Sequence, residues 1–270
     1  FTVGQSNALN QNGISNVSWN WKAGTTGSGT TTGSGTGKAY SYSVNTTAGF
    51  SIVAYGGNGS SGHTIPHHLG VAPSAVWIKQ RSDSEEWRVG QTSLSSNFSS
   101  GVHLSLNNAA WTQTGAFNDT APSSTVFTVG NFNSTNGDGD NLIAYCFAQK
   151  KGYSKFGSYT GDGNANGPFI YTGFKPGFLL IKCTSHTGNW HLADNTRVGF
   201  NPWNYRLQPQ DNNAEYQGSA IYSDFLSNGF NLRNSDTDTN GSGRTYMYIA
   251  IAEEPLVANS GTDGVPATAR

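Results

Sequence analysis

The sequence predicts an all-β protein built from tandem antiparallel β-sandwich repeats with a jelly-roll-like arrangement. Charged residues make up only 11% of the 270-residue chain, whereas aromatic residues make up 12% and glycines number 35. Aromatic and β-branched side chains suit pleated sheets, and Gly and Asn favour the turns between strands. Sustained helical periodicity is missing from the sequence, while short apolar runs bounded by turn residues recur. These features together are typical of antiparallel sandwiches.

An internal repeat of about 103 residues runs through the chain. The stretch AYGGNGSSGHTIPHHLGVAPSAVWIKQRSDSEEWRV at 54–89 aligns with SYTGDGNANGPFIYTGFKPGFLLIKCTSHTGNWHL at 158–192. Farther along, LIAYCFAQ aligns with YMYIAIAE. The pattern predicts two complete copies, each folded as a β-sandwich. Their predicted bounds are 49–152 and 153–257, followed by a C-terminal tail at 258–270.

The opening segment 1–23, FTVGQSNALNQNGISNVSWNWKA, aligns without a gap with FTVGNFNSTNGDGDNLIAYCFAQ at 127–149. Trp21 then matches Phe147 near the end of both stretches. A strand pair without the rest of its sheet cannot bury its apolar face. We therefore expect residues 1–23 to be the closing strands of a truncated upstream repeat, and the chain to be a fragment of a longer polypeptide.

Residues 24–48 separate this partial copy from the first complete one, and they begin with GTTGSGTTTGSGTG. A low-complexity run of Gly, Ser and Thr is the composition of a flexible linker. The sequence therefore predicts a spacer here, without chemistry of its own.

Alternation within the short runs predicts which side chains face a core. In NWHL, Trp190 and Leu192 are predicted to face inward and His191 outward. In EWRV, Trp87 and Val89 share one face in the same way. Both tryptophans are therefore predicted to be core residues.

Charge and hydropathy exclude several classes of partner. The formal net charge is −1 and Lys and Arg do not cluster, so the chain lacks the basic patch that nucleic-acid binding requires. The apolar runs have the length of a buried strand, which is too short to cross a bilayer as a helix. Cys146 and Cys183 lie in apolar strand-like contexts, where two buried thiols and a single disulfide are both open alternatives.

Two matching hairpins carry oxygen ligands of the kind that calcium prefers. DTDTNG at 236–241 begins like a calcium loop, D-x-D-x-N-G, but Met247 stands where the bidentate Glu belongs. The first copy has NGDGDN in the same place. The candidate calcium ligands are Asp236, Asp238 and Asn240, with Asp138 and Asp140 in the first copy. The alternative is a pair of solvated hairpin tips.

The loop GFNPWNYR is the sequence's candidate ligand-binding site, because the two copies diverge most in this region. Its candidate residues are Trp203, Tyr205 and Arg206. Sugar binding commonly combines an aromatic face with nearby amide and hydroxyl groups, and this loop offers both. The alternative is that the aromatic residues cap one end of a sandwich.

Signals of catalysis are weak. G-x-S-x-G elbows and phosphate-binding loops are missing from the sequence, and the acids sit mostly in turns. The histidines of HTIPHH are separated by a proline in a strand-like context, which does not suit zinc. We therefore expect no enzymatic activity, and no cofactor beyond the candidate calcium.

The repeat as a whole resembles a known family. The succession AGFSIVAYGGNG…TIPHHLGVAPSAVWIK, GYSKFGSYTGDGNANGPFIYTGFKPGFLLIK, DFLSNGFNLRN and YIAIAEEP is similar to a repeated domain in virion proteins of tailed phages of marine bacteria, notably cyanobacteria. VSWNWKAG followed by a Gly/Ser/Thr spacer resembles that family too. The resemblance covers nearly the entire chain and brings no catalytic residues with it.

The resemblance implies a tail fibre or other appendage on the virion surface. Its expected partners are other virion proteins and a receptor or glycan of the host cell surface, and phage fibres by analogy imply a homotrimer. Two alternatives remain open at this point. One is a protein that decorates the phage head, and the other is a secreted bacterial adhesin or carbohydrate-binding module with similar repeats.

Overall fold

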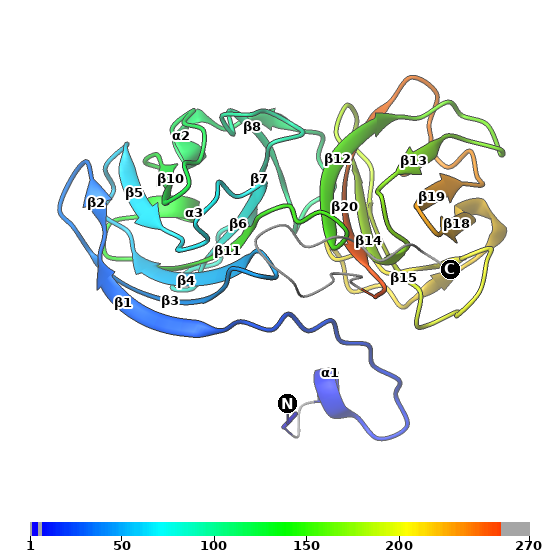
Figure 1. Ribbon diagram of the computed structural model, residues 1–270, viewed down its shortest axis with the longest axis horizontal. Helices are drawn as coiled ribbons and strands as arrows, with labels where there is room; N and C mark the ends of the chain where they lie inside the picture. The colour runs from blue at the N-terminus through cyan, green and yellow to red at the C-terminus, as the bar shows by residue number, and fades with distance from the viewer. Residues whose placement is uncertain (1, 5–6, 255–270) are drawn as a thin grey trace.

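The computed structural model describes residues 2–4 and 7–254 and contains two β-sandwiches side by side (Figure 1). Every pairing between its named strands is antiparallel. The all-β prediction is therefore confirmed. The C-terminal tail predicted at 258–270 lies outside the described residues, as does the end of the second predicted repeat at 255–257.

The first sandwich consists of a large sheet of eight strands and a small sheet of three. The large sheet runs in the order β1 (Thr25–Thr30), β3 (Ala39–Asn45), β4 (Phe50–Gly56), β11 (Asn141–Phe147), β6 (Ala75–Gln80), β7 (Arg88–Gln91), β8 (Ser100–His103) and β9 (Trp111–Thr112). The small sheet runs β10 (Val126–Val129), β5 (His63–Pro66) and β2 (Thr32–Gly33). Two short helices, α2 (Thr114–Phe117) and α3 (Asn133–Asn136), flank β10.

The second sandwich repeats this plan with fewer strands. Its large sheet runs β12 (Ser154–Thr160), β20 (Thr245–Ala252), β14 (Pro176–Cys183) and β15 (Trp190–Asp194). Its small sheet runs β13 (Phe169–Tyr171), β19 (Gly229–Leu232) and β18 (Ser223–Leu226). A separate ribbon joins β16 (Tyr205–Arg206) and β17 (Tyr216–Gln217), and a 3-10 turn, η1, spans Ser219–Ile221.

Each sandwich has its own apolar core between its two sheets. In the first, Val53, Ile78 and Phe127 are fully buried together. In the second, Leu179 and Phe230 play the same part. Full burial of such side chains contributes about 1.5–3 kcal/mol each, so two separate cores account for two folded units.

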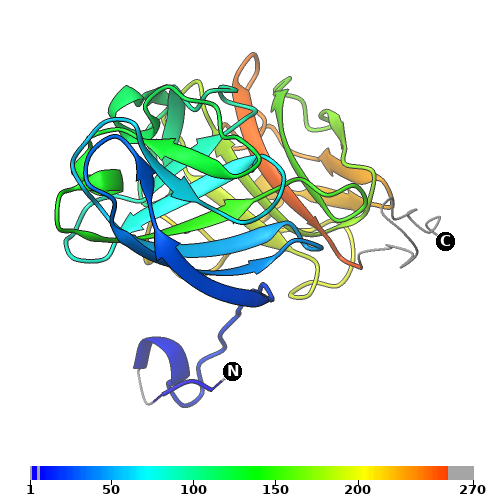
Figure 2. The same cartoon turned by 60° about the vertical axis from the view of Figure 1, so that its left-hand side comes forward.

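A third apolar layer joins the two sandwiches through the outer faces of their large sheets. We use outer face for the face that points away from the small sheet of the same sandwich. Phe147 and Val89 of the first sandwich belong to one buried cluster with Leu180 and Met247 of the second. Figure 2 shows the two large sheets turned towards each other. Both sheets are therefore covered on both faces over part of their length, which explains apolar runs such as LIAYCFA and FLLIKC.

The two-sided burial corrects the predicted facing of β15. Trp190 and Leu192 are buried as predicted, but they face the neighbouring sandwich and not the core of their own. His191, predicted to face outward, is 1% exposed and contacts Trp203. The prediction assumes that one face of the strand lies on a core and the other in solvent. In the structure both faces of β15 are buried, one in the second sandwich and one between the two sandwiches.

Hydrogen bonds fix the joint between the sandwiches. The indole Nε1 of Trp190 donates to the carbonyls of His103, at 2.9 Å, and Leu106, at 3.2 Å. The backbone N–H of Ala110 donates to the carbonyl of Thr184 at 2.8 Å. Further bonds across the joint include those from Gln91 Nε2 to Tyr248 O, from Lys182 Nζ to Asn107 O, and from Gly188 N to Asn107 O. Because hydrogen bonds are directional, these bonds together with the apolar layer favour one orientation of the two sandwiches.

Matching contacts in the two sandwiches support the predicted repeat. The hydroxyl of Tyr55 donates to the carbonyl of Thr135 at 2.7 Å, and that of Tyr159 donates to the carbonyl of Thr239 at 2.7 Å. The order β4–β11–β6–β7 in the first large sheet also parallels β12–β20–β14–β15 in the second. The division into repeats at 49–152 and 153–257 stays a prediction.

The predicted linker at 24–48 is wrong, because this segment contributes β1, β2 and β3 to the first sandwich. Its glycines have a packing reason. A Cβ on Gly27 would lie 2.6 Å from the hydroxyl of Tyr42, and one on Gly29 would lie 2.9 Å from the ring of Tyr40. The tyrosine rings of β3 therefore lie over bare backbone in β1, an arrangement by which aromatic residues stabilise glycine in an edge strand.

The opening segment does not form the closing strands expected for 1–23. In its described part, residues 2–4 and 7–23, one short helix forms, α1 (Asn7–Asn10), and no strand. The alignment pairs α1 with α3, so the helix is present in both copies. The amide of Asn45 at the end of β3 donates to the carbonyl of Lys22 at 3.2 Å, but the strand pairing with β3 begins only at Thr25 of β1. Its origin in an upstream repeat stays a prediction.

The two cysteines are free and buried, so the disulfide alternative is wrong. Cys146 lies in the core of the first sandwich and Cys183 in that of the second. Burial raises the pKa of the Cys146 thiol. Within the described residues, no helix has the length and hydrophobicity needed to cross a membrane.

Candidate functional site

The second sandwich covers only part of the first sandwich's outer face. Along β4, Val53 is buried under the small sheet, whereas Ile52 and Ala54 on the outer face remain partly exposed. The same alternation in β11 leaves Ile143 and Tyr145 partly exposed. This uncovered area contains two adjoining pockets.

The first, which we call the aromatic pocket, has a volume of about 300 Å³. Seven of its lining residues are aromatic and none is charged. They are Trp19, Asn20, Trp21, Phe50, Ile52, Trp77, Trp87, Leu104, Tyr145 and Phe147. A pocket of this kind favours a neutral ligand with flat apolar surfaces.

Strand register places the aromatic rings of the pocket side by side. Tyr145 of β11 lies opposite Trp77 of β6, so their side chains share the outer face. The ring centroids of Trp77 and Phe147 are 5.0 Å apart, and those of Trp87 and Tyr145 are 5.9 Å apart. Rings at these distances pack favourably, which holds the pocket wall in place.

The WNW motif at 19–21 forms the other wall. Trp21 lies edge to face with Phe178 of the second sandwich at 5.6 Å and with Phe147 of the first at 6.3 Å. Trp19 contacts Phe178 at 5.9 Å and has the guanidinium of Arg197 at 5.9 Å from its ring. The opening segment is therefore anchored at the seam between the sandwiches.

The aromatic pocket also has polar groups. The Nε1 of Trp77 is buried and has no hydrogen-bond partner among the described residues. A buried donor left unpaired costs about 1–3 kcal/mol. The amide of Asn20 adds a second polar group, whose nitrogen donates to the hydroxyl of Ser18 at 3.2 Å.

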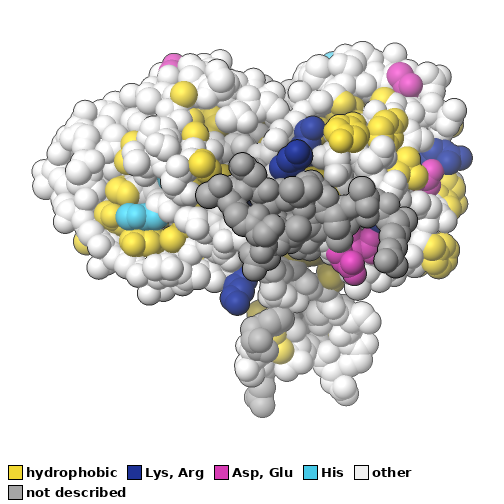
Figure 3. Space-filling model, viewed as in Figure 1, with side chains coloured by type: hydrophobic (Ala, Val, Ile, Leu, Met, Phe, Trp, Pro, Cys, Tyr) yellow, Lys and Arg dark blue, Asp and Glu magenta, His cyan; other side chains and the backbone are white. Residues whose placement is uncertain are grey.

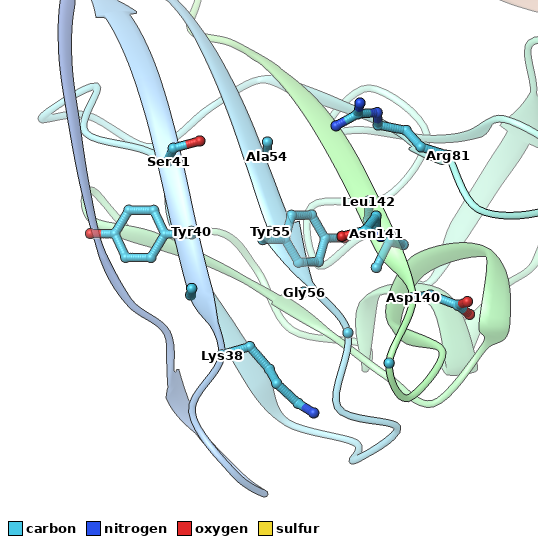
Figure 4. A pocket seen from close by; sticks show the side chains of 13 residues that line it. Lys38, Tyr40, Ser41, Ala54, Tyr55, Gly56, Arg81, Asp140, Asn141 and Leu142 are labelled. Carbon is cyan, nitrogen blue, oxygen red and sulfur yellow. The ribbon is translucent and has the colours of Figure 1, made fainter.

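The second, which we call the polar pocket, lies farther along the same strands and has a volume of about 400 Å³ (Figure 4). Its lining residues are Lys38, Ala39, Tyr40, Ser41, Ala54, Tyr55, Gly56, Gly57, Arg81, Gly139, Asp140, Asn141 and Leu142. Ala54 and Gly56 come after Ile52 on the outer face of β4. Because β11 is antiparallel to β4, Asn141 at the start of β11 lies at the same end, beyond Tyr145. The two pockets are thus consecutive parts of one surface.

The two acids at this end already have protein partners. Asp138 pairs with Lys38 at 3.1 Å. Asp140 accepts hydrogen bonds from the hydroxyl of Ser82 at 2.9 Å and from the amide of Gln80. Asp138 and Asp140, two of the five predicted calcium ligands, therefore have hydrogen-bond or ion-pair partners within the protein.

The remaining candidate calcium ligands also have protein partners. The amide nitrogen of Asn240 donates to the carbonyl of Asn234 at 2.7 Å, and the side chain is fully buried. Asp238 pairs with Arg206 at 3.4 Å, and Asp236 accepts from the backbone N–H of Asp238. Burial raises the pKa of Asp236.

These contacts identify DTDTNG as a structured turn. Across residues 2–4 and 7–254, no three His, Cys, Asp or Glu side chains come together as a metal cluster. Calcium binding at either hairpin stays a prediction.

The candidate ligand loop at 203–206 does not present a stacking surface at Trp203. Its side chain is 1% exposed, lies parallel to Phe225 at 6.0 Å, and donates its Nε1 to the carbonyl of Asp194. The assignment of Trp203 as a ligand-binding residue is therefore corrected, because the ring fills the end of the second sandwich. Position in a divergent loop does not by itself indicate exposure.

The other two residues of that loop are partly exposed and held by neighbours. The guanidinium of Arg206 lies 5.2 Å from the ring centroid of Tyr216 and pairs with Asp238. Tyr205 packs against the core of the second sandwich. A ligand-binding role for Tyr205 and Arg206 stays a prediction.

The histidines of HTIPHH are structural. His63 is fully buried and hydrogen-bonds with the hydroxyl of Thr31 at 2.6 Å, which ties the 24–48 segment to β5. Burial lowers the pKa of His67 to about 4, so this residue is neutral near pH 7. His68 stacks on Tyr42 with ring centroids 3.6 Å apart.

A third pocket, of about 510 Å³, lies between the two sandwiches. Serine and threonine dominate its lining, with Tyr159 as its single aromatic residue. Its wall therefore lacks the cluster of rings that marks the aromatic pocket, and we take the outer face of the first sandwich as the candidate site.

The sequence predictions did not include this site, and the prediction of Trp87 as a core residue is wrong, because its ring is partly exposed at the pocket. In AVWIK and LIAYCF, Trp77 and Tyr145 alternate with fully buried neighbours. Large aromatic residues in the half-exposed register of a central strand indicate a binding face or an interface. The paired tryptophans of WNW, Trp19 and Trp21, supply the same signal from the opening segment.

Comparison with known proteins gives a family without an activity. A family model described as a domain of unknown function (DUF7483) matches residues 1–255. Curated proteins and solved structures give no match to the chain. The function has to be argued from the geometry of the site.

Proposed function

Because the chain belongs to the DUF7483 family, whose description names no activity, we propose a function from the candidate site alone. The chain is a non-enzymatic binding module that holds a sugar ring of a surface glycan in the aromatic pocket. The observation that carries this proposal is the uncharged lining with seven aromatic residues around about 300 Å³.

The chemistry of the pocket matches that of a sugar ring. A pyranose has apolar C–H faces that stack on aromatic rings and hydroxyl groups at its edge that need hydrogen-bond partners. Trp87 and Tyr145 offer partly exposed ring surfaces, and the amide of Asn20 offers a polar group at the pocket. Small-ligand pockets in general combine apolar walls with a few placed polar groups.

The residues that line the pocket are held in place by their packing, so binding a ligand does not require a large loss of side-chain entropy. Phe50 and Phe147 on its floor also belong to the apolar layer between the sandwiches. Trp21 bridges the two sandwiches on the opposite wall. A preformed site spends less of its interaction energy on ordering side chains.

The setting we propose is the surface of a phage virion, most simply a tail fibre or similar appendage that contacts the host cell. The support is the sequence resemblance described above, together with the sparse charged side chains on the face seen in Figure 3. Other virion proteins and a homotrimeric assembly belong to this setting by analogy. Labelling of intact virions with an antibody to the chain tests it. Tail labelling supports an appendage, head labelling a decoration protein, and no labelling a secreted adhesin.

The binding proposal is tested by glycan-array screening followed by calorimetry with purified chain. The Trp87→Ala variant removes a partly exposed ring from the pocket and is expected to lower affinity by about tenfold or more. Tyr171→Ala is the matched control, because Tyr171 is an exposed aromatic residue on β13, outside the pocket. Equal binding by the wild type and Trp87→Ala, or no glycan retained at all, contradicts the proposal.

A further inference from the structure

The polar pocket adds a second element to the surface that holds the sugar ring. Resting on the glycan-binding function proposed above, we infer that the ligand is an acidic oligosaccharide. One ring occupies the aromatic pocket, and an anionic substituent on another ring of the same short oligosaccharide lies between Lys38 and Arg81. The shared chemistry is a carboxylate or a sulfate ester.

Strand geometry places the two pockets within reach of one short oligosaccharide. Tyr145 in the aromatic pocket and Asn141 at the polar pocket are four residues apart on β11. At about 3.4 Å per residue this corresponds to about 14 Å along the strand. Between them on the outer face lie Ile143 of β11 and, opposite it, Ala54 of β4, whose short side chain leaves room beside Ile143.

The floor of the polar pocket is low because Gly56 carries no side chain. A Cβ on Gly56 would lie 3.2 Å from Cβ of Lys38, so the stem of Lys38 packs directly over this glycine. The pocket therefore keeps its depth only with a very small residue at position 56. Figure 4 shows Lys38 and Arg81 on opposite sides of the strand ends that carry Gly56 and Asn141.

The two basic residues differ in how they are held. Lys38 pairs with Asp138, whose side chain is 74% exposed, so the pair is solvated and weak. An anionic ligand can share its ammonium group without a large loss. Arg81 is exposed and forms no salt bridge within the described part of the chain. Its backbone N–H donates to the carbonyl of Asn141 at 2.7 Å, which fixes its base at the pocket rim.

Charge along the outer face is therefore asymmetric. The aromatic pocket has no charged lining residue. The polar pocket is lined by two basic residues and one acid, Asp140, which accepts hydrogen bonds from Gln80 and Ser82, and Asp138 beside the pocket pairs with Lys38. A guanidinium binds the paired oxygens of a carboxylate or sulfate in a bidentate manner. The surface thus matches a ligand that is neutral at one end and anionic at the other.

Matched trisaccharides test this inference by calorimetry: one neutral, one with a terminal uronic acid and one with a terminal sulfate ester. We expect either or both acidic forms to bind about tenfold more tightly than the neutral one at low salt. The preference should shrink as ionic strength rises, because salt screens exposed charges. The two acidic forms distinguish a carboxylate from a sulfate as the preferred group.

Arg81→Gln is expected to remove the preference for the acidic forms over the neutral trisaccharide. Lys151→Gln, at an exposed lysine away from the pocket, is the matched control and should keep the preference. Equal affinity for neutral and acidic forms, or a preference that survives in Arg81→Gln, overturns this inference and leaves the glycan-binding function intact. Failure of all three trisaccharides and of the glycan array overturns both.

Discussion

Trp21 packs edge to face against Phe178, with ring centroids 5.6 Å apart. One residue comes from the opening segment and the other from the second sandwich, and the same indole also contacts Phe50 and Phe147 of the first. A single side chain thus links three parts of the chain at the edge of the aromatic pocket. This relationship makes the opening segment a part of the aromatic pocket.

Replacing Trp21 by Ala is therefore expected to weaken both stability and binding. Each aromatic pair contributes about 0.5–1.5 kcal/mol beyond the area that it buries. We expect a loss of about 1–3 kcal/mol in the free energy of unfolding, measured by urea denaturation. Leu9→Ala, at an exposed apolar residue of the same segment, serves as the control. A Trp21→Ala variant as stable as the wild type would show that the contact contributes nothing in solution.

The Nε1 of Trp190 is expected to stabilise the joint between the sandwiches. Trp190→Phe leaves the carbonyls of His103 and Leu106 without this donor. Leaving a buried polar group unpaired costs about 1–3 kcal/mol. In Trp111 the Nε1 has no partner among the described residues, so Trp111→Phe is the matched control and should cost less. Urea titrations of both variants measure the difference, and equal losses would contradict the role of the bond.

The segment at 24–48 should behave as part of the first sandwich. Gly27→Val introduces a side chain where the ring of Tyr42 lies, and overpacking of this kind costs about 1–3 kcal/mol. Ser28→Val, at the exposed neighbouring position of β1, is the control. Limited proteolysis should cut the Gly27→Val chain within 24–48 faster than either the wild type or Ser28→Val. Rapid cleavage of the wild type at this segment would restore the flexible-linker interpretation.

Stability should fall on acidification because His191 is buried. Burial, and then the charges of Arg206 and Arg197, lower its pKa to about 3 in the folded chain. The unfolded value is about 6.5, so below that pH the unfolded state binds more protons than the folded one. The contribution of the neutral imidazole is full above about pH 6.5 and is lost as the pH falls towards 3.

His191→Phe tests this dependence, because it removes the titrating group and keeps a ring of similar size beside Trp203. The free energy of unfolding, measured from pH 7 to pH 4, should fall less steeply for His191→Phe than for the wild type. Parallel curves would assign the acid sensitivity to other groups, such as His103, whose pKa burial lowers to about 4.

The fold could be predicted from local patterns because strand alternation and turn residues are local properties. The runs AVWIKQ and VFTVG lie where β6 and β10 form. Local sequence patterns do not indicate which sheet or sandwich packs on each face of a strand. For this reason the facing of His191 was predicted wrongly, and the apolar layer that contains Leu180 and Met247 was not foreseen.

The site was harder to predict because it depends on residues far apart in the chain. Trp21, Trp77 and Tyr145 belong to three separate segments that meet only in the folded molecule. Composition was also misleading at 24–48, where glycines serve the packing of Tyr40 and Tyr42 and not flexibility. Trp203 shows the converse, since a loop aromatic residue turned out to be buried against Phe225.

The central claim, that a glycan binds in the aromatic pocket, is tested most directly by the indole N–H signals of the chain. The sequence has 7 tryptophans, so ¹⁵N-labelled protein should give one resolvable indole signal for each in NMR spectra. On titration with the tightest-binding trisaccharide, the signals of Trp19, Trp21, Trp77 and Trp87 should shift. Those of Trp111, Trp190 and Trp203 should stay in place. Shifts confined to the second group, or none at saturating ligand, would contradict the account.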